Sequence, residues 1–270
     1  MPERLVRFRG PEGQVAWGLV EGQEVLPLLA QPFGLPHRDA PFAIDERLPA
    51  GPKLALDECE PLAPCRPSKI IGIGTNYRAH AEEMGRAIPP VPKMFLKAPS
   101  AVVDPGSPVL IPPVTTRVDH EAELAVVIGR PCSRVSEAEA LEYVLGYTAA
   151  NDVTARDFQR ADKVFARGKG FDTFCPLGPS VALGLDPSDL RVRCFVNGEL
   201  RQDGSTADMI FPVPELISFV SHVMTLLPGD VILTGTPSGV GPLVDGDEVV
   251  VEVEGVGRLH SPVFDRDDRG

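Results

Sequence analysis

Apolar and polar residues alternate in short stretches over the first thirty positions of the chain. Apolar residues at every second position give the period of a half-buried strand, and glycines separate the stretches. Strands are therefore predicted over 5–8, 15–20 and 24–28. Prolines are dense from 31 to 67, and no long period holds there, which indicates a connection. We predict a small β-rich N-terminal domain with its connection over 1–65, and a larger domain over 66–270.

The larger domain contains many short apolar segments and few long helical periods. Its predicted strands lie at 69–74, 94–97, 109–111 and 124–128, and in a closing hairpin, DEVVVEVEGVGRLHSPV. Helices are predicted over 75–85, 136–145 and 214–224, the second from a capping-box pattern of Ser136 and Glu139. Asn197-Gly198 indicates a two-residue hairpin. Because strands and helices do not alternate regularly, the predicted fold class is mainly β with α (α+β), neither a doubly wound sheet nor a barrel of βα units.

Composition and charge narrow the possible partners. With 270 residues, of which 43% are hydrophobic, the chain can bury one sizeable core. A net charge of -12, with no Lys/Arg-rich run, disfavours binding to nucleic acid or to an anionic membrane surface. No apolar run approaches the roughly 18 residues of a membrane span, and the N-terminus has no apolar signal core, so a cytoplasmic protein is expected. The five cysteines lack CxxC spacing and are expected to be free thiols, mostly buried.

Three carboxylates are candidate metal ligands. Glu121 and Glu123 lie two positions apart, so on a strand both side chains face the same side. Side by side they repel one another unless a cation lies between them, and oxygen ligands favour magnesium, manganese or calcium. Asp152 is the natural third ligand, because an apolar strand breaks at Asn151-Asp152. The alternatives are a solvent-facing polar stripe for the two glutamates and a turn or helix cap for Asn151-Asp152.

His80 and Glu83 form a candidate general-base pair. Their i, i+3 spacing on one helical turn lets the carboxylate reach the imidazole. A carboxylate that accepts from one ring nitrogen fixes the tautomer and raises the basicity of the other nitrogen. Without ligand, we expect this segment to be mobile or partly open, with a long or absent hydrogen bond between the two residues. A purely structural histidine is the alternative.

Further candidate residues follow along the chain. Arg156 is interpreted either as a substrate clamp or as the partner of Asp157, and Gln159 comes shortly after it. Lys169, between two glycines, is either an electrostatic catalyst that reaches into a pocket or a mobile surface lysine. The segment TGTPSGVG can offer backbone N–H groups and the Thr236 hydroxyl to a carboxylate, although it lacks the spacing of a phosphate-binding P-loop.

In their order and amino-acid sequences, these segments closely resemble those of the fumarylacetoacetate hydrolase superfamily. The resemblance runs from about residue 69 to residue 263. The segments that carry it are IGIGTNYRAHAEE, PKMFLKAPSAV, VDHEAELAVVIG, YTAANDVTARDFQ, KGFDTFCPLGP, LLPGDVILTGTPSGVG and VEVEGVGRL. It implies a β-sandwich roll, usually a homodimer, with a small N-terminal unit in front. Within the superfamily, the chain is most similar to bacterial 2-hydroxyhepta-2,4-diene-1,7-dioate isomerases.

The resemblance also implies roles for individual residues. They are metal ligation of Mg²⁺ or Mn²⁺ by Glu121, Glu123 and Asp152, activation of water by His80 and Glu83, a pocket lysine at Lys169, and contacts to a small carboxylate substrate by Arg156, Gln159 and Thr236. The longer fumarylacetoacetate hydrolases have a further aspartate ligand upstream of the histidine, where this chain reads GIGT. This departure argues against fumarylacetoacetate itself as the substrate.

The resemblance further implies a reaction through a metal-bound enolate of a small 2-oxo or 2,4-dioxo carboxylic acid. Carbon-carbon hydrolysis of an acylpyruvate-type acid and isomerisation of a 2-hydroxyhepta-2,4-diene-1,7-dioate rank nearly level, because the His80–Glu83 pair favours a reaction that uses water. Oxaloacetate decarboxylation ranks third, since it needs no general base. A non-catalytic binding paralogue is the alternative of another class, and the complete set of carboxylates with the dyad argues against it.

Overall fold

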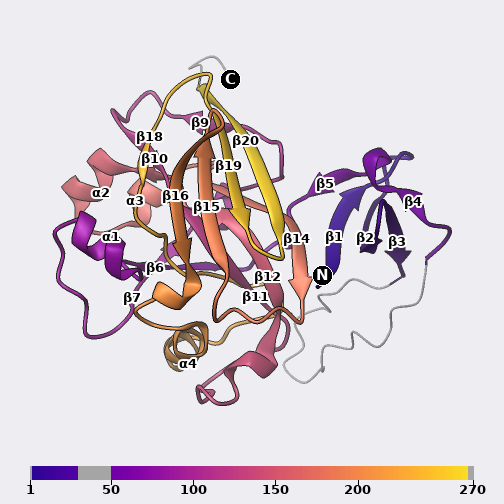
Figure 1. Ribbon diagram of the computed structural model, residues 1–270, viewed down its shortest axis with the longest axis horizontal. Coiled ribbons are helices and arrows are strands. Elements are labelled where there is room, and N and C mark those ends of the chain that lie inside the picture. The colour runs from indigo at the N-terminus through magenta and orange to yellow at the C-terminus, as the bar shows by residue number, and fades with distance from the viewer. Residues whose placement is uncertain (1, 30–49, 267–270) are drawn as a thin grey trace.

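A computed structural model describes residues 2–29 and 50–266 of the chain, so the predicted connection lies partly outside the described residues (Figure 1). The N-terminal part is a small antiparallel sheet in the order β4-β3-β2-β1, and β5 also pairs with β1. Its strands are β1 (Glu3–Arg9), β2 (Val15–Glu21), β3 (Glu24–Leu28), β4 (Leu54–Ala55) and β5 (Glu60–Leu62). The three strands predicted for this region are confirmed. Val6, Phe8, Val25 and Cys59 form their own small core.

The main sheet continues from this N-terminal sheet. β1 pairs antiparallel with β14 at Glu3–Leu183 and Leu5–Val181, and the order then runs β14-β12-β11-β17-β6-β7. These strands are β14 (Cys175–Leu183), β12 (Val144–Asn151), β11 (Ala122–Ile128), β17 (Val231–Leu233), β6 (Ile70–Gly74) and β7 (Lys93–Lys97), with β8 (Val102–Val103) beside β14. All seven residues of β11 are buried, which explains why its apolar run does not alternate.

A second, five-stranded sheet packs against the first. Its order is β16-β15-β19-β20-β9, with β16 (Glu199–Ser205), β15 (Arg191–Val196), β19 (Glu248–Val253), β20 (Gly257–Asp265) and β9 (Val109–Ile111). Alternate residues of β15 and β19 are buried and join the apolar residues of β11 and β12 in the largest core cluster. A third, three-stranded sheet has the order β13-β10-β18, formed by Thr154–Ala155, Val118–His120 and Gly241–Leu243. The architecture is the expected mainly β sandwich roll behind a small β-rich domain.

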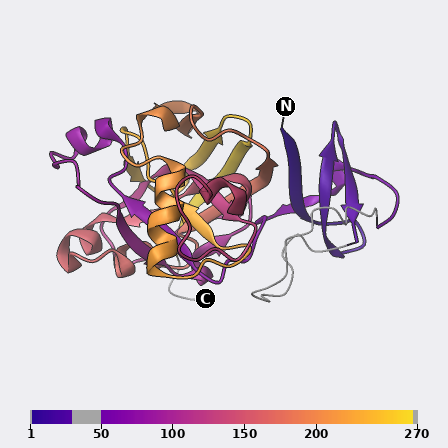
Figure 2. The ribbon, with the colours of Figure 1, turned by 90° about the horizontal axis from the view of Figure 1, so that it is seen from below.

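Helices are short and lie around the sheets (Figures 1 and 2). They are α1 (Arg78–Glu83), α2 (Arg156–Asp162), α3 (Ala166–Lys169) and α4 (Val213–Val223), with 3-10 turns at Leu56–Glu58, Pro99–Ala101, Ala140–Tyr143 and Thr206–Asp208. The helices predicted over 75–85 and 214–224 correspond to α1 and α4. The Asn197-Gly198 hairpin joins β15 to β16, and both residues have the positive φ, 53° and 80°, that a type I′ turn requires.

The helix predicted over 136–145 is wrong. Ser136 Oγ does bond Glu139 Oε2 at 2.6 Å, so the local capping signal is real. Only the 3-10 turn Ala140–Tyr143 follows it, because Val144 already begins β12 and pairs with Ile128 of β11. Pairing in the buried sheet therefore overrides the helix signal within one turn. All five cysteines are buried free thiols, as predicted, and no helix among the described residues is long and apolar enough to cross a membrane.

Candidate metal centre and general-base pair

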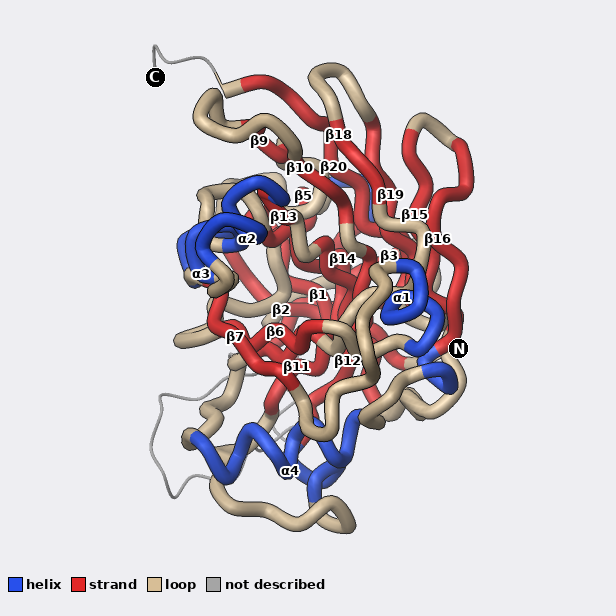
Figure 3. Tube along the Cα trace, turned by 90° about the vertical axis from the view of Figure 1, so that its left-hand side faces the viewer, coloured by secondary structure: helices blue, strands red, loops and turns tan. Residues whose placement is uncertain are grey.

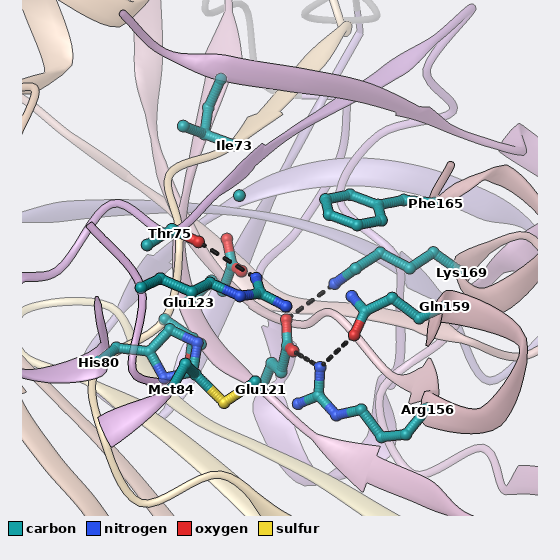
Figure 4. A pocket seen from close by; sticks show the side chains of 13 residues that line it. Ile73, Thr75, His80, Met84, Glu121, Glu123, Arg156, Gln159, Phe165 and Lys169 are labelled. Atoms are coloured by element: carbon teal, nitrogen blue, oxygen red, sulfur yellow. Dashed lines mark hydrogen bonds and ion pairs between the residues drawn. The ribbon is translucent and has the colours of Figure 1, made fainter. Parts of the chain in front are cut away.

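Residues of α1, α2 and α3 line a pocket. These three helices lie on the side of the molecule away from the N-terminal sheet (Figures 1 and 3). The pocket contains about 350 Å³ of open space, counting the solvent at its mouth. Seven separate segments line it: the end of β6 with Gly74 and Thr75, α1, Arg86, the β10–β11 junction, α2, the segment that contains Phe165 and Lys169, and Thr236 after β17. Figure 4 shows their side chains converging.

The three predicted carboxylates meet in this region. Glu121, Glu123 and Asp152 are each at most 5% exposed, and one ligand oxygen from each lies within 4.8 Å of the others. Strand pairing explains the convergence, because Ala122 is opposite Asn151 in the antiparallel β11–β12 pair. Asp152 N donates to Glu121 O at 2.9 Å, and Glu121 N donates to Asn151 Oδ1 at 2.9 Å. Because Glu121 and Glu123 are buried, the alternative interpretation of a solvent-facing polar stripe is wrong.

Cations surround two of these carboxylates but leave the third undercompensated. Lys169 Nζ donates to Glu121 Oε2 at 2.8 Å and also contacts Asp152 Oδ2, while Arg156 Nη1 lies 2.7 Å from Glu121 Oε1. Although burial by itself raises it, the charges of Lys169 and Arg156 hold the pKa of Glu121 below its ordinary value. Burial, followed by the charges of Asp152 and Glu121, raises the pKa of Glu123 well above its ordinary value.

This donor set fits a hard divalent cation. All three groups are carboxylates, the ligands that Mg²⁺ and Mn²⁺ prefer. Glu123 is buried beside two other carboxylates, and both its burial and their negative charges favour its protonated form when no cation is bound. A bound divalent cation would supply compensating positive charge, so the residues present fit such an ion.

His80 and Glu83 are in contact on α1. His80 Nδ1 lies 3.0 Å from Glu83 Oε2, and His80 is only 5% exposed. The other oxygen, Glu83 Oε1, accepts from Gly239 N at 3.0 Å and so ties α1 to the loop after β17. The expectation of a long or absent hydrogen bond is wrong, because Gly239 N–H and the i, i+3 spacing together hold the carboxylate against the imidazole.

Arg156 has a different partner from the one offered by sequence. Its Nε donates to Asp119 Oδ2 at 2.7 Å and its Nη1 to Gln159 Oε1 at 3.0 Å. Asp157 instead accepts from Thr115 Oγ1 at 2.5 Å, so the alternative of an Arg156–Asp157 pair is wrong. The buried Nη2 of Arg156 has no hydrogen-bond partner among the residues that the structure describes, and it remains able to donate to an acid.

Two further predicted residues occupy defined positions in the pocket. Lys169 ends α3 and is 3% exposed, with its ammonium group 4.9 Å from the centre of the Phe95 ring, so the mobile surface lysine is wrong. Thr236 lines the pocket, but its Oγ1 donates to Ala122 O at 2.8 Å. The proton of this hydroxyl is therefore already used, contrary to the expectation that it is offered to a carboxylate.

Three residues that the sequence reading missed complete the site. Lys97 of β7 is fully buried and lies 2.7 Å from Asp152 Oδ1, Asp119 anchors Arg156, and Gln202 of β16 donates to Thr236 Oγ1 at 2.7 Å. Lys97 and Asp119 lie in segments that carry the family resemblance, but in the sequence they cannot be distinguished from ordinary charged residues on the surface of a strand. Gln202 carries no sequence signal, because it is the one buried residue of a mostly polar strand.

Comparison with known proteins shows which families the chain matches. Residues 69–264 match the family described as fumarylacetoacetate (FAA) hydrolase C-terminal, and residues 3–64 match the family described as Rv2993c-like, N-terminal. The chain is 40% identical to the mitochondrial oxaloacetate tautomerase FAHD2A of Homo sapiens, over 96% of this chain and 91% of that protein.

Two solved structures show the same similarity over nearly the whole chain. One is the crystal structure of 2-hydroxyhepta-2,4-diene-1,7-dioate isomerase from Mycobacterium marinum, with a TM-score of 0.87 and 41% identity over 98% of this chain and 100% of that one. The other is maleylpyruvate hydrolase from Sphingobium sp. SYK-6 in complex with manganese(II) ion and pyruvate, with a TM-score of 0.80 and 34% identity over 98% of this chain and 100% of that one.

Proposed function

Because this chain belongs to the fumarylacetoacetate hydrolase family, we propose that it is a divalent-metal-dependent enzyme that moves a proton between the keto and enol forms of a small 2-oxo acid. The observation that carries this proposal is the meeting of three buried carboxylates, a His80–Glu83 pair and the unpartnered Nη2 of Arg156 around one pocket. The confined pocket favours a short substrate, such as an oxaloacetate-like or hydroxydienedioate-like acid.

Glu121, Glu123 and Asp152 would hold the cation, Mg²⁺ or Mn²⁺. When bound, it would polarise the 2-oxo group and stabilise the negative charge that develops there. The remaining work falls to side chains of this chain. Arg156 Nη2 donates to the substrate carboxylate and orients it, while the ammonium group of Lys169 offsets charge near the reacting oxygen.

His80 is the base in this proposal. Glu83 Oε2 accepts from the Nδ1–H of His80 and thereby leaves Nε2 of this pocket-lining histidine as a proton acceptor. Nε2 removes a proton from the carbon next to the 2-oxo group, and the same proton is delivered to the 2-oxygen to give the enol; the reverse reaction returns it from that oxygen to the carbon. A second candidate is carbon-carbon hydrolysis of an acylpyruvate, in which the same nitrogen deprotonates water. The likeness to the maleylpyruvate hydrolase, which was solved with manganese and pyruvate, favours keeping this second reaction.

A substrate panel tests the proposal. Oxaloacetate tautomerisation, hydroxydienedioate isomerisation, acylpyruvate hydrolysis and oxaloacetate decarboxylation are measured with Mg²⁺ or Mn²⁺ and after EDTA. We expect proton-transfer turnover that EDTA abolishes and either metal restores. His80→Ala should lower this turnover roughly 10²- to 10⁴-fold, the usual contribution of a general base, while Mn²⁺ binding persists. Metal-independent turnover, or a His80→Ala enzyme as fast as wild type, would contradict the proposal.

A further inference from the structure

Gln202 is a buried amide on an exposed strand. In β16 only this residue is buried, with 1% of its surface exposed. The pairing with β15 shifts here, because Cys194 faces Gln202 whereas Phe195 faces Leu200. One extra residue, Arg201, is thus accommodated in a β-bulge, a feature that redirects side chains. The bulge lies next to Gln202, the residue of β16 whose polar side chain points inward.

The amide uses its full hydrogen-bonding capacity. Oε1 accepts from Ala122 N at 2.9 Å and lies 3.1 Å from His120 Nδ1. Nε2 donates to Thr236 Oγ1 at 2.7 Å and to Pro237 O at 2.8 Å. Ala122 N can only donate and Pro237 O can only accept, so these two backbone groups fix which way the amide points.

These contacts surround the candidate metal ligands. His120 and Ala122 are the two chain neighbours of Glu121, and Gln202 bonds to both. Thr236 and Pro237 follow Gly235, whose N–H donates to Glu123 Oε2 at 2.6 Å. One amide therefore joins the backbone beside the first carboxylate to the loop that orients the second. Thr236 Oγ1 closes the ring by donating to Ala122 O.

β16 and the loop after β17 approach so closely that a side chain would clash at two glycine positions. A Cβ on Gly239 would lie 2.0 Å from the carbonyl oxygen of Arg201, and a Cβ on Gly204 would lie 2.6 Å from the Pro237 side chain. Gly239 also has φ +95°, which an L side chain rarely adopts. The two glycines thus let the strand reach the loop, and Gln202 makes the polar connection between them.

We propose that Gln202 is a positioning residue that fixes Glu121, Glu123 and Thr236 relative to one another. The inference rests on the proposed function, because the two glutamates are taken as ligands of the cation. It adds a consequence for Thr236: its proton goes to Ala122 O and one lone pair accepts from Gln202, so only the second lone pair is left for the pocket. The Thr236 hydroxyl is an acceptor toward the ligand, suited to a hydroxyl or water proton.

Mn²⁺ affinity tests the positioning role without any substrate. The full-length chain is titrated with Mn²⁺ by calorimetry, well below its melting temperature. Gln202→Leu removes all the amide contacts and should weaken Mn²⁺ binding by about 10- to 100-fold, the range for groups that orient metal ligands. Gln202→Glu keeps an acceptor for Ala122 N–H, so it should lose less Mn²⁺ affinity than Gln202→Leu. Both variants lose the donor to Thr236 Oγ1 and to Pro237 O, so both should have a lower kcat than wild type.

Ile217→Val is the matched control for lost stability. Ile217 is buried in α4 outside the pocket, and the loss of one buried methyl group lowers stability without touching the site. It should leave Mn²⁺ affinity unchanged. If the folded Gln202→Leu protein binds Mn²⁺ like wild type, or Ile217→Val loses as much affinity, the positioning role is overturned. A wild type that binds Mn²⁺ but converts no acid would overturn the proposed function alone, and one that does not bind Mn²⁺ would overturn both.

Discussion

Glu123 is the residue where the electrostatics of the site are least balanced. Lys169 and Arg156 compensate Glu121, and Lys97 and Lys169 compensate Asp152. Among the residues that the structure describes, Gly235 N–H is the one hydrogen-bond donor to Glu123. Burial, and then the charges of Asp152 and Glu121, raise its pKa. A buried carboxylate in such surroundings binds a proton when it has no cation, so proton and metal compete for it.

This competition predicts a proton release on metal binding. Since the folded-state pKa of Glu123 is raised, the group is protonated at a pH where an ordinary glutamate is ionised, and Mn²⁺ must displace that proton. Mn²⁺ affinity should therefore increase as pH rises through this raised pKa. Calorimetry in two buffers with different ionisation enthalpies measures the released proton. Glu123→Gln should bind Mn²⁺ more weakly and release none, whereas equal release from both proteins would assign the proton to another group.

At the scale of elements, the side chain of Glu83 attaches α1 to the loop after β17. The helix has only six residues, too few to be stable alone, and Glu83 bonds both His80 and Gly239 N. Glu83 therefore has two roles that sequence spacing cannot separate: it orients the imidazole, and it holds the helix over the pocket.

Hydrogen exchange should reveal the attachment. Glu83→Ala removes the acceptor for Gly239 N–H, so backbone amides of α1 should exchange up to about tenfold faster, as expected for one lost hydrogen bond. Mass spectrometry of the peptide that contains α1 measures this rate. Glu82→Ala, at an exposed neighbouring position, is the control and should exchange like wild type. Equal protection in wild type and Glu83→Ala would show that other contacts hold the helix.

For the molecule as a whole, the N-terminal sheet is hydrogen-bonded to the main sheet and shares part of its core, in addition to the covalent connection. β1 pairs with β14, and Leu5 and Leu19 share a core cluster with Leu145 and Val181 of the main sheet. Figures 1 and 2 nevertheless show this sheet at the far end of the molecule from α1, α2 and α3. It can stabilise the main sheet without contributing to the pocket.

We propose that the chain is a homodimer formed by its larger domain. Light scattering at micromolar concentration should give twice the 29.0 kDa of one chain. Deletion of residues 1–64 should leave the dimer intact but lower the melting temperature, because it exposes the edge of β14 and its apolar neighbours. A monomeric full-length enzyme with normal turnover would contradict the dimer, and a dimer lost on deletion would place the interface on the N-terminal sheet.

The sequence alone determined those features that depend on neighbours along the chain. Strand alternation, the Asn197-Gly198 turn, the Glu121/Glu123 spacing and the His80/Glu83 spacing are local, because backbone geometry sets which side chains share a face. The residues themselves offered Asp152, Lys169 and Arg156 as candidates, and the family resemblance assigned them to one site.

Only the tertiary structure decided which groups distant in the sequence meet, and which of them donate or accept hydrogen bonds. The helix predicted over 136–145 does not form, because β12 pairs with β11 from Val144 onward. Arg156 pairs with Asp119 and not with its neighbour Asp157. Lys97 and Gln202 reach the site from other strands, the latter across 80 positions to Ala122. Strand register and burial set these contacts: a buried polar group must find a partner wherever the packed sheets place one, and no local pattern encodes that place.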